Sequence, residues 1–422
     1  MIRNKTMRHT DAHKAKHISI RQIAVALVLL TGCLLPAAGW AQSGDATVDA
    51  LTEMGFENVA WTEDDEERVY VLQNSAYRLM GVGIGKAVDV IQEKGLPDRK
   101  PCRIIVLDNN VPQISLRYEP VTDDSLAVAT RNSWDVSYDL GDSWKKIRKV
   151  ERKNSSLFKV DILVYPKLYF KNVVITQVYQ VCLELSPAVE VSLWKGSKLS
   201  LQMIVPVYTD GYAEPNGNFR PGYLTLEQNV RLPHNIWLRG VVGVFNRNSY
   251  GAEISAYHPF KNERFAVEGK FGLVGIGYFN SFSKFLYNGE TRWYWSVGGD
   301  YYWSRFNTQI KARMEQYLLK DIGARLEVIR HFRYASVGFY GLVSDKASSN
   351  GGFKISIALP PYRYKRRGYI PRISTSQVFG ITYNAGNEAK YYLMPTSTAD
   401  DSNNMMKTNQ YNPYFIKSEL SN

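Results

Sequence analysis

The sequence holds few of the residues that build metal sites and disulfide frameworks. Of its 422 residues, 3 are cysteine and 6 are histidine. Cys102 and Cys182 are the cysteines that follow residue 42, too few for a disulfide framework, so we expect two unpaired thiols. His234, His258 and His331 each lack a second histidine or cysteine at the spacing of metal ligands. The sequence therefore predicts no metal site and no cofactor.

Beyond residue 42 the chain also lacks an apolar run of the ~18 residues that a spanning helix needs. The apolar run Ile23 to Leu30 follows a basic segment and leads to the small residues Gly39 and Ala41. This order predicts a secretory signal over residues 1–42, with a lipoprotein processing site at Cys33 as the alternative. Without that segment, which holds six basic residues and one acidic residue, the formal charge falls from +12 to +7.

Three motifs invite a catalytic or ligand-binding interpretation, but each lacks the arrangement that its chemistry needs. Gly81–Lys86 is followed by Ala87 where a phosphate loop has Ser or Thr, and we expect its glycines to allow a tight turn and close helix packing. The acidic run 63–67 lacks the alternating ligands of a calcium loop. Nothing in the sequence places Glu253 and Glu268 together as a glycosidase pair. We therefore expect no catalytic residue and no enzyme activity.

What the chain does have is tyrosine and tryptophan, 28 and 9 residues, and an alternation of polar and apolar residues from 156 to 386. In FAVEGKFGLVG, residues 265–275, Glu268 and Lys270 stand between apolar residues in a run with little helical character. We count roughly 12–16 such segments of about 10 residues, the expected size of a membrane-spanning strand. The alternation predicts a mainly β domain over residues 156–386.

Alternation alone does not separate a soluble sandwich from a membrane barrel, because both have one apolar strand face. Three features favour an antiparallel transmembrane β-barrel. The segments are long, they follow one another as hairpins without helices, and aromatic residues gather near their ends as in the belts at membrane interfaces. These aromatic residues are Trp194, Tyr208, Trp237, Tyr257, Trp293, Trp303, Tyr317 and Tyr334. A secreted β-sandwich remains the alternative.

Residues 43–120 have a different pattern, which predicts a small α+β module of ββαββ order. Its strands are expected at residues 55–61, 68–74, 103–108 and 113–118, and its helix at 82–94. Residues 121–155 form a polar connector with one expected strand near Trp134 to Tyr138. The tail, residues 387–422, is polar, and Tyr414–Ile416 is a candidate last short strand.

In a closed barrel the apolar residues face lipid and the charged residues between them face the interior. The candidates for the lumen are Arg264, Glu268, Lys270, Lys311, Arg313, Glu315 and Lys354. The densest basic patch, residues 362–369, supplies candidates for contact with a glycan or a lipid phosphate: Arg363, Lys365, Arg366 and Arg367. A loop at the membrane rim is the alternative for this patch. Behind a secretion signal we expect no nucleic-acid ligand.

Several short phrases occur in both parts of the chain. In the module these are GFENV at 55–59, VYVLQN at 69–74 with Tyr77 and Arg78, and IIVLDNNVPQISLRY. In the barrel they are NGGFKISIALPP at 350–361 and PRISTSQVFGITYNAG at 371–386. Together these phrases resemble the YjbH-like exopolysaccharide proteins. The resemblance implies an outer-membrane β-barrel that works with machinery for making or exporting an exopolysaccharide or capsule. It also implies two partners, a periplasmic β-rich protein and a small lipoprotein.

These observations predict a non-enzymatic component of exopolysaccharide or capsule secretion or assembly. Its barrel would lie in the outer membrane and its N-terminal module in the periplasm. The expected partners are outer-membrane lipid, the exopolysaccharide, and periplasmic and lipoprotein components of the secretion system. A general porin-like or structural outer-membrane barrel is the alternative, and a secreted glycan-binding β-sandwich is less favoured.

Overall fold

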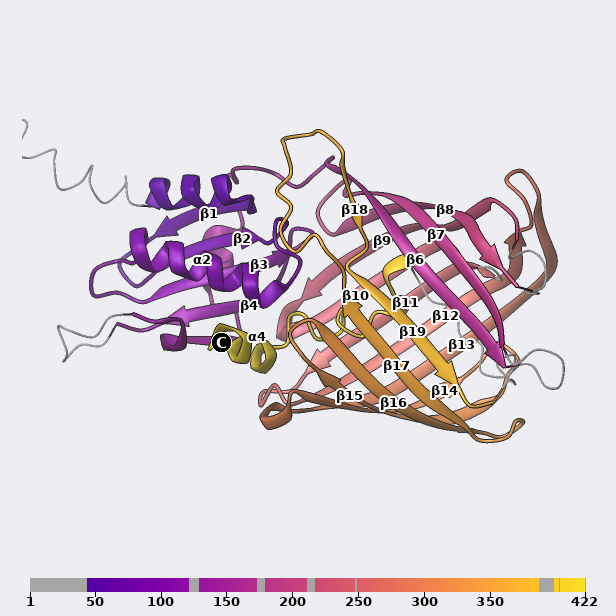
Figure 1. Ribbon diagram of the computed structural model, residues 1–422. Helices are drawn as coiled ribbons and strands as arrows, with labels where there is room; N and C mark the ends of the chain where they lie inside the picture. The colour runs from indigo at the N-terminus through magenta and orange to yellow at the C-terminus, as the bar shows by residue number, and fades with distance from the viewer. Residues whose placement is uncertain are drawn as a thin grey trace, which may run out of the picture.

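The computed structural model describes residues 44–120, 129–172, 179–210, 217–246, 249–386, 398–401 and 403–421. The expected signal segment with Cys33 lies outside these ranges. No helix within them is long and apolar enough to cross a membrane. The described chain forms a small sheet with helices, which lies at one end of a much larger sheet that curves into a barrel (Figure 1).

The N-terminal module is a five-stranded sheet in the order β1-β2-β3-β4-β5. A helix at residues 44–54 precedes β1 (Glu57–Glu63), β2 (Arg68–Gln73), α2 (Met80–Lys94), β3 (Cys102–Asp108) and β4 (Val111–Tyr118). The connector supplies β5 (Trp134–Ser137), which pairs with β4, and the short helix α3 (Ser143–Ile147). Part of the expected connector therefore belongs to this sheet, and the fully buried Trp134 lies in its core with Phe56 and Ile84.

The glycine-rich motif lies inside a helix rather than in a turn. Helix α2 begins at Met80, so Gly81, Gly83 and Gly85 occupy its first turns. A Cβ atom at Gly81 would lie 2.5 Å from the side chain of Glu419, and one at Gly83 would lie 2.5 Å from Asn74. The expected close packing is therefore confirmed, and the expected tight turn is wrong.

The second sheet has 14 strands, and all of its neighbours except one pair are antiparallel. Twelve long strands follow one another as hairpins: β6 (Val160–Asn172), β7 (Tyr179–Val191), β8 (Ser197–Thr209), β9 (Arg220–Leu232), β10 (Ile236–Asn246), β11 (Ser249–Pro259), β12 (Phe265–Phe279), β13 (Phe285–Trp303), β14 (Thr308–Gln316), β15 (Ile322–His331), β16 (Ala335–Ser344) and β17 (Asn350–Ala358). The predicted fold class, a β-barrel with a small α+β module, is confirmed. The alternative of a two-sheet sandwich is wrong.

The two short strands β18 (Arg372–Thr375) and β19 (Val378–Asn384) complete the wall. β18 runs parallel to β6, with Arg372 opposite Asp161, and β19 runs antiparallel to β17. The ring of Tyr383 on β19 lies 6.0 Å from that of Phe170 on β6. The segment Arg372–Asn384 therefore pairs first with β6 and, after Thr375, with β17. It thereby brings the two edges of the sheet together.

The two faces of this wall differ as the alternation predicts. Val267 and Phe271 on β12 and Leu326 on β15 point outward, and each is more than 40% exposed. Lys311 and Glu327 alternate with such residues and are buried inside. Because a polar, charged interior and an apolar exterior suit a bilayer, the barrel has the architecture of an outer-membrane protein.

The expected aromatic belts are present in part. Trp194, Trp303 and Tyr334 are exposed at the turns on the module side of the barrel. Tyr317 instead is 1% exposed, and its hydroxyl donates to Glu315 at 2.7 Å. Trp237 packs against Tyr138 of the module, with ring centroids 5.2 Å apart. Position near a strand end therefore does not by itself place an aromatic side chain in the belt.

The C-terminal tail returns to the module (Figure 1). Residues 398–401 and 403–412 lie against the inner wall, where Met405 N–H donates to Ser356 Oγ at 3.1 Å. Helix α4 (Pro413–Leu420) then packs beside α2, with the Asn412 side chain accepting from the Tyr414 and Phe415 N–H groups. The candidate last strand at Tyr414–Ile416 is therefore wrong, because this segment is a capped helix.

The outward orientation of Leu326, in the middle of β15, can be tested by the substitution Leu326→Lys. A lysine at the bilayer midplane of a transmembrane barrel costs about 2–4 kcal/mol. We expect a loss of that size in the free energy of unfolding, measured by urea titration of the protein folded into vesicles. Phe158→Lys is the control, because Phe158 is also exposed but precedes β6 on the module side. Equal losses in both variants would contradict a lipid-facing Leu326.

Candidate functional site: a charged chamber in the barrel lumen

The lumen contains a cavity of about 580 Å³ between the barrel wall and the returning tail. Strands β9 to β15 and β17 supply its wall, and Asp401, Asn403, Asn404, Met405, Lys407 and Thr408 supply its other side. We call residues 398–412 the plug, excluding residue 402, which is not described. The plug is held by polar contacts and by the buried apolar side chains of Ala399 and Met406.

Six of the seven predicted lumen residues line this chamber: Glu268, Lys270, Lys311, Arg313, Glu315 and Lys354. The seventh, Arg264, lies at the exposed turn before β12, with its guanidinium 5.4 Å from the ring centre of Tyr414. The six come together because they occupy inward positions on β12, β14 and β17. Alternation alone was enough to find them.

Glu327 is the centre of the ion pairs in the chamber. It contacts Arg325 at 2.7 Å, Lys354 at 2.8 Å and Arg313 at 3.3 Å. Arg313 also binds Glu268, which joins β12 to β15 through β14. Three cations therefore share one carboxylate, and no apolar group separates them from the cavity.

Arg325 and Glu327 were absent from the predicted set although they obey the same alternation. Arg239 was also absent, and its partners lie far apart in the sequence. It contacts Glu227 on β9 at 2.7 Å and Asp401 of the plug at 2.8 Å. The contact with Asp401 could not be predicted, because the plug has no alternating pattern that would place its residues opposite a particular strand.

The plug is fixed to the wall by ion pairs at two places. Asp400 contacts Lys198 on β8 at 2.9 Å, and Asp401 contacts Arg239 on β10. Lys407 lies between these two carboxylates, at 3.1 Å from Asp400 and 2.8 Å from Asp401. These side chains are only partly exposed, so the ion pairs fix the position of the plug against β8 and β10.

The chamber is lined by many charged side chains. Its lining includes seven cationic and four carboxylate side chains, and four further carboxylates, those of Glu227, Glu253, Asp300 and Asp400, pair with cations of the lining. The cations are Arg239, Lys270, Lys311, Arg313, Arg325, Lys354 and Lys407, and the carboxylates are Glu268, Glu315, Glu327 and Asp401. Aromatic rings of Trp237, Tyr257 and Tyr317 also line it. This combination suits a hydrated anion or an acidic sugar.

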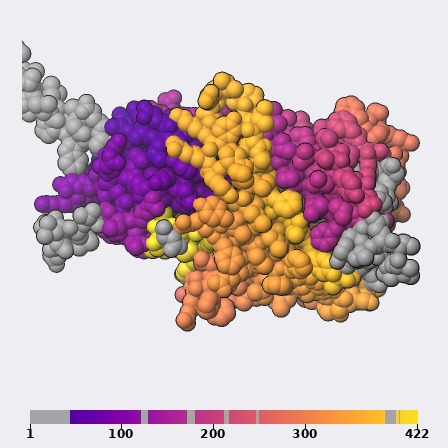
Figure 2. Space-filling view, in the orientation of Figure 1, coloured from indigo at the N-terminus to yellow at the C-terminus, as the bar shows by residue number. Residues whose placement is uncertain are grey.

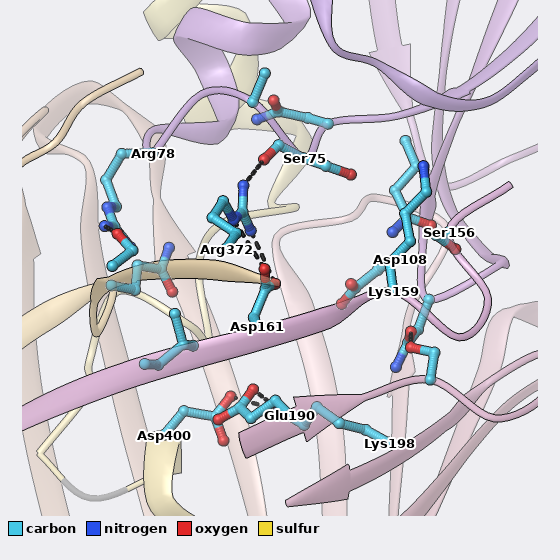
Figure 3. A pocket seen from close by; sticks show the side chains of 18 of the residues that line it. Ser75, Arg78, Asp108, Ser156, Lys159, Asp161, Glu190, Lys198, Arg372 and Asp400 are labelled. Atoms are coloured by element: carbon cyan, nitrogen blue, oxygen red, sulfur yellow. Dashed lines mark hydrogen bonds and ion pairs between the residues drawn. The ribbon is translucent and has the colours of Figure 1, made fainter. Parts of the chain in front are cut away.

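A second cavity of about 290 Å³ lies where the module meets the barrel (Figure 3). At its centre Asp161 accepts from Arg372 at 2.8 Å and from Arg366, while Arg372 also donates to the Ser75 carbonyl at 2.5 Å. Glu190, Lys198 and Asp400 line its floor. The cavity holds nearly balanced charges and joins the module, the wall and the plug.

One module group at this junction has a displaced pKa value. Burial, with a smaller contribution from Arg372, lowers the pKa of Arg78 to about 10. Arg78 stays charged at neutral pH and donates to Ser374 and Thr375 of the barrel at 3.0 and 3.1 Å.

The predicted basic patch lies across the same junction (Figure 2, orange atoms between the module and the wall). Arg366 is engaged with Asp161 and, at 2.7 Å, with Glu57 of the module. Lys365 donates to the Glu53 carbonyl at 2.5 Å, and the Arg363 guanidinium lies 5.3 Å from the ring centre of Tyr77. Arg367 is exposed. Three of the four residues therefore attach the barrel to the module.

The described residues contain no group of three or more His, Cys, Asp or Glu that could hold a metal ion. Cys102 and Cys182 are both buried, and neither forms a disulfide in the described part of the chain, as expected. His331 donates to or accepts from Ser336 at 2.8 Å and contacts Gln309 at 3.3 Å, so it has a structural role.

Comparisons with known proteins add little. No family model and no curated protein matches the sequence. Among solved structures, a triple mutant of Rh. blastica porin is 8% identical, and the match covers 48% of this chain and 90% of the porin with a TM-score of 0.26. A double mutant of that porin is 9% identical, with coverages of 48% and 90% and a TM-score of 0.27. The β-barrel assignment therefore rests on strand pairing and the apolar outer face.

The central position of Glu327 predicts the effect of Glu327→Gln. Removing the charge leaves Arg313, Arg325 and Lys354 close together without their common counter-ion. We expect the free energy of unfolding to fall by about 2 kcal/mol, the value typical of a lost charged hydrogen bond. Urea titration followed by gel mobility of unboiled samples measures it. Glu290→Gln, at an exposed carboxylate that contacts Arg292 alone, is the control and should change little. An unchanged stability of Glu327→Gln would mean that water already screens the three cations.

Proposed function

We propose that this protein is a non-enzymatic outer-membrane component of exopolysaccharide or capsule secretion, in which the barrel gives an acidic polymer a polar path that the plug keeps closed. The observation that carries the proposal is the chamber lined by arginine, lysine and aromatic side chains and bounded on one side by the chain's own tail. A path that the plug closes when no polymer passes suits polymer export, since a permanently open pore would let small solutes through.

The chemistry of the chamber supports an acidic sugar polymer. Arginine forks bind carboxylates with two hydrogen bonds, and aromatic faces pack on sugar rings. Glu268 and Glu327 add acceptors for hydroxyl groups beside the cations. The resemblance of the module and barrel phrases to YjbH-like proteins supports the same reading. A periplasmic β-rich protein and a small lipoprotein are the partners that we propose on that basis.

We propose that the module lies in the periplasm. The turns between strands on the module side are short, for example residues 233–235 and 332–334, as is usual on the periplasmic side of such barrels. The segment at 359–371 is longer, and it contacts the module through Arg363, Lys365 and Arg366. A module held at the periplasmic mouth is placed to receive a polymer or a partner before the lumen.

A general porin-like barrel is the second candidate. The favourable observation is the water-accessible, charged interior, which resembles the interior expected of a porin more than that of a purely structural barrel. The two candidates differ in what the plug does, because a porin needs an open path for small solutes at all times.

Conductance in planar bilayers separates these two functions. The intact protein should show low conductance, and removal of residues 398–422 should raise it severalfold, because the plug contacts the wall through Asp400, Asp401 and Lys407. The double substitution Asp400→Asn with Asp401→Asn should give partial opening. The control is the substitution of the exposed module carboxylates Glu93 and Asp98 by Gln and Asn. High conductance of the intact protein would favour the porin-like candidate.

Selectivity tests the polymer class in the plug-less variant. Oligogalacturonate should reduce the current at lower concentration than a neutral maltooligosaccharide of equal length, because arginine and lysine side chains of the lining can bind its carboxylates. In cells, deletion of the gene should lower surface polysaccharide while precursor synthesis continues, and the wild-type gene should restore it. Equal block by both sugars together with unchanged surface polysaccharide would overturn the proposal.

A further inference from the structure

The outward face of β15 ends in an arginine. Along this strand Leu326 and Val328 are exposed on the outside of the wall, while Glu327 and Ile329 between and after them are buried. Arg330 is the next outward residue, and it is exposed. The other outward positions of β15 are apolar, so the series that faces lipid finishes with a single positive charge on the module side.

Arg330 lies near the edge of the apolar band of the barrel. It follows Leu326 by four residues, and a rise of about 3.3 Å per residue with a strand tilt of ~40° separates the two by about 10 Å along the bilayer normal. The apolar band of such a barrel is about 25 Å tall, so its edge lies about 12 Å from the midplane. An arginine at this depth extends its guanidinium to the lipid head groups while its methylene groups stay in the apolar region.

A second arginine, Arg305, adjoins Arg330 in the turn after β13. The His331 N–H donates to the Asn307 carbonyl at 2.9 Å, which holds this turn against the end of β15. The guanidinium of Arg305 lies 5.5 Å from the ring centre of Phe306, and that of Arg330 lies 5.8 Å from the same centre. Two cations therefore border one aromatic ring on the rim of the barrel.

Exposed aromatic side chains surround the two guanidiniums. The rings of Phe306 and Trp303 pack edge to face, with centroids 4.8 Å apart. Phe332 lies on the other side, with its ring centre 5.3 Å from the Arg330 guanidinium. All three rings are exposed, as in the aromatic belt at a membrane interface. We call these three rings and the two arginines the rim cluster.

The two arginines of the rim cluster differ from Arg333 in the next turn. Arg333 contacts Glu419 of α4 at 3.0 Å, so its charge is balanced within the protein. Within the described ranges of the chain, Arg305 and Arg330 contact aromatic rings and form no ion pair with a carboxylate. Their charge is therefore left for an anion from outside the protein. At the edge of the apolar band, the phosphate groups of lipids are the anions that a bilayer supplies.

We propose that the rim cluster binds the phosphate group of an anionic phospholipid in the leaflet on the module side. Arg305 and Arg330 donate hydrogen bonds to the phosphate oxygens, for which guanidinium groups are well suited. The aromatic rings pack on the glycerol and the first carbons of the acyl chains. The rim cluster shares no residue with the chamber, so the proposal does not depend on whether the barrel exports polysaccharide.

Photocrosslinking in the full-length protein tests where the lipid binds. One sample carries p-benzoylphenylalanine in place of Phe306, and the other carries it in place of Phe282, which is exposed at the opposite end of the barrel. Each protein is folded into vesicles of equal parts phosphatidylglycerol and phosphatidylcholine, and the attached lipid is identified by mass spectrometry. We expect a severalfold excess of phosphatidylglycerol at position 306 and equal amounts at position 282. Equal amounts at position 306, or the same excess at both positions, would overturn the proposal.

Neutral variants test whether the two arginines cause this preference. Arg305→Gln with Arg330→Gln should bring the two lipids at position 306 to nearly equal amounts. Lys284→Gln with Lys320→Gln is the control, because it removes the same charge from exposed turns at the opposite end of the barrel and should leave the excess unchanged. The gel mobility of unboiled samples checks that each variant is folded. If the arginine variant does not fold, the comparison of positions 306 and 282 decides alone. A full excess in the folded arginine variant would contradict the assignment.

A competition experiment distinguishes lipid phosphate from free phosphate. Inorganic phosphate, compared with chloride at equal ionic strength, should leave the excess of phosphatidylglycerol at position 306 unchanged, because a free anion lacks the acyl chains that hold the lipid beside the wall. Loss of the excess in phosphate alone would indicate a site for a free anion and would overturn the lipid assignment.

Discussion

The pairing of backbone groups inside the bilayer is the constraint on which the rest of this structure depends. Lipid offers no hydrogen bonds, so each strand that crosses it needs a neighbour on both sides. The chain meets that need by placing twelve long strands next to one another in sequence order and by folding Arg372–Asn384 into the remaining gap. Once the wall is closed, the side-chain period of two decides which face of the wall each residue occupies. Charged residues that alternate with apolar ones then face the lumen.

This constraint explains how much of the molecule could be predicted from its sequence. The barrel and six chamber residues could be predicted from the alternation of apolar and polar residues. This alternation arises because one face of each strand contacts the bilayer and the other contacts water. Glu268 and Lys270 are the clearest case, since an apolar run interrupted by paired charges fits neither a core nor a surface. The four strands and the helix of the module follow from their own periods in the same way.

What could not be predicted lacks such a period. The plug is a polar segment whose contacts lie on β8, β10 and β17. Ion pairs such as that of Asp401 with Arg239 join residues whose spacing in the sequence follows no regular pattern. Helix α4 did leave a signal, because Asn412 followed by Pro413 is a typical helix start. The partners of the basic patch could not be predicted for a different reason. Arg366 pairs with Glu57 of the module and Asp161 of the barrel, which are distant in the sequence and come together only where the two domains meet.

The tail links the three parts of the molecule that a polymer would have to pass. At its end, Glu419 contacts Arg333 at 3.0 Å and lies against Gly81 of α2, so the helix that follows the plug touches both the wall and the module. In the middle, Lys407 joins Asp400 to Asp401, and Asn403 contacts Gly380 and Thr382 on β19. A movement of the module that shifts α4 would therefore be transmitted to the segment that lines the chamber. Because the plug is joined to the wall by several ion pairs at once, such a movement could open the lumen only by breaking them together.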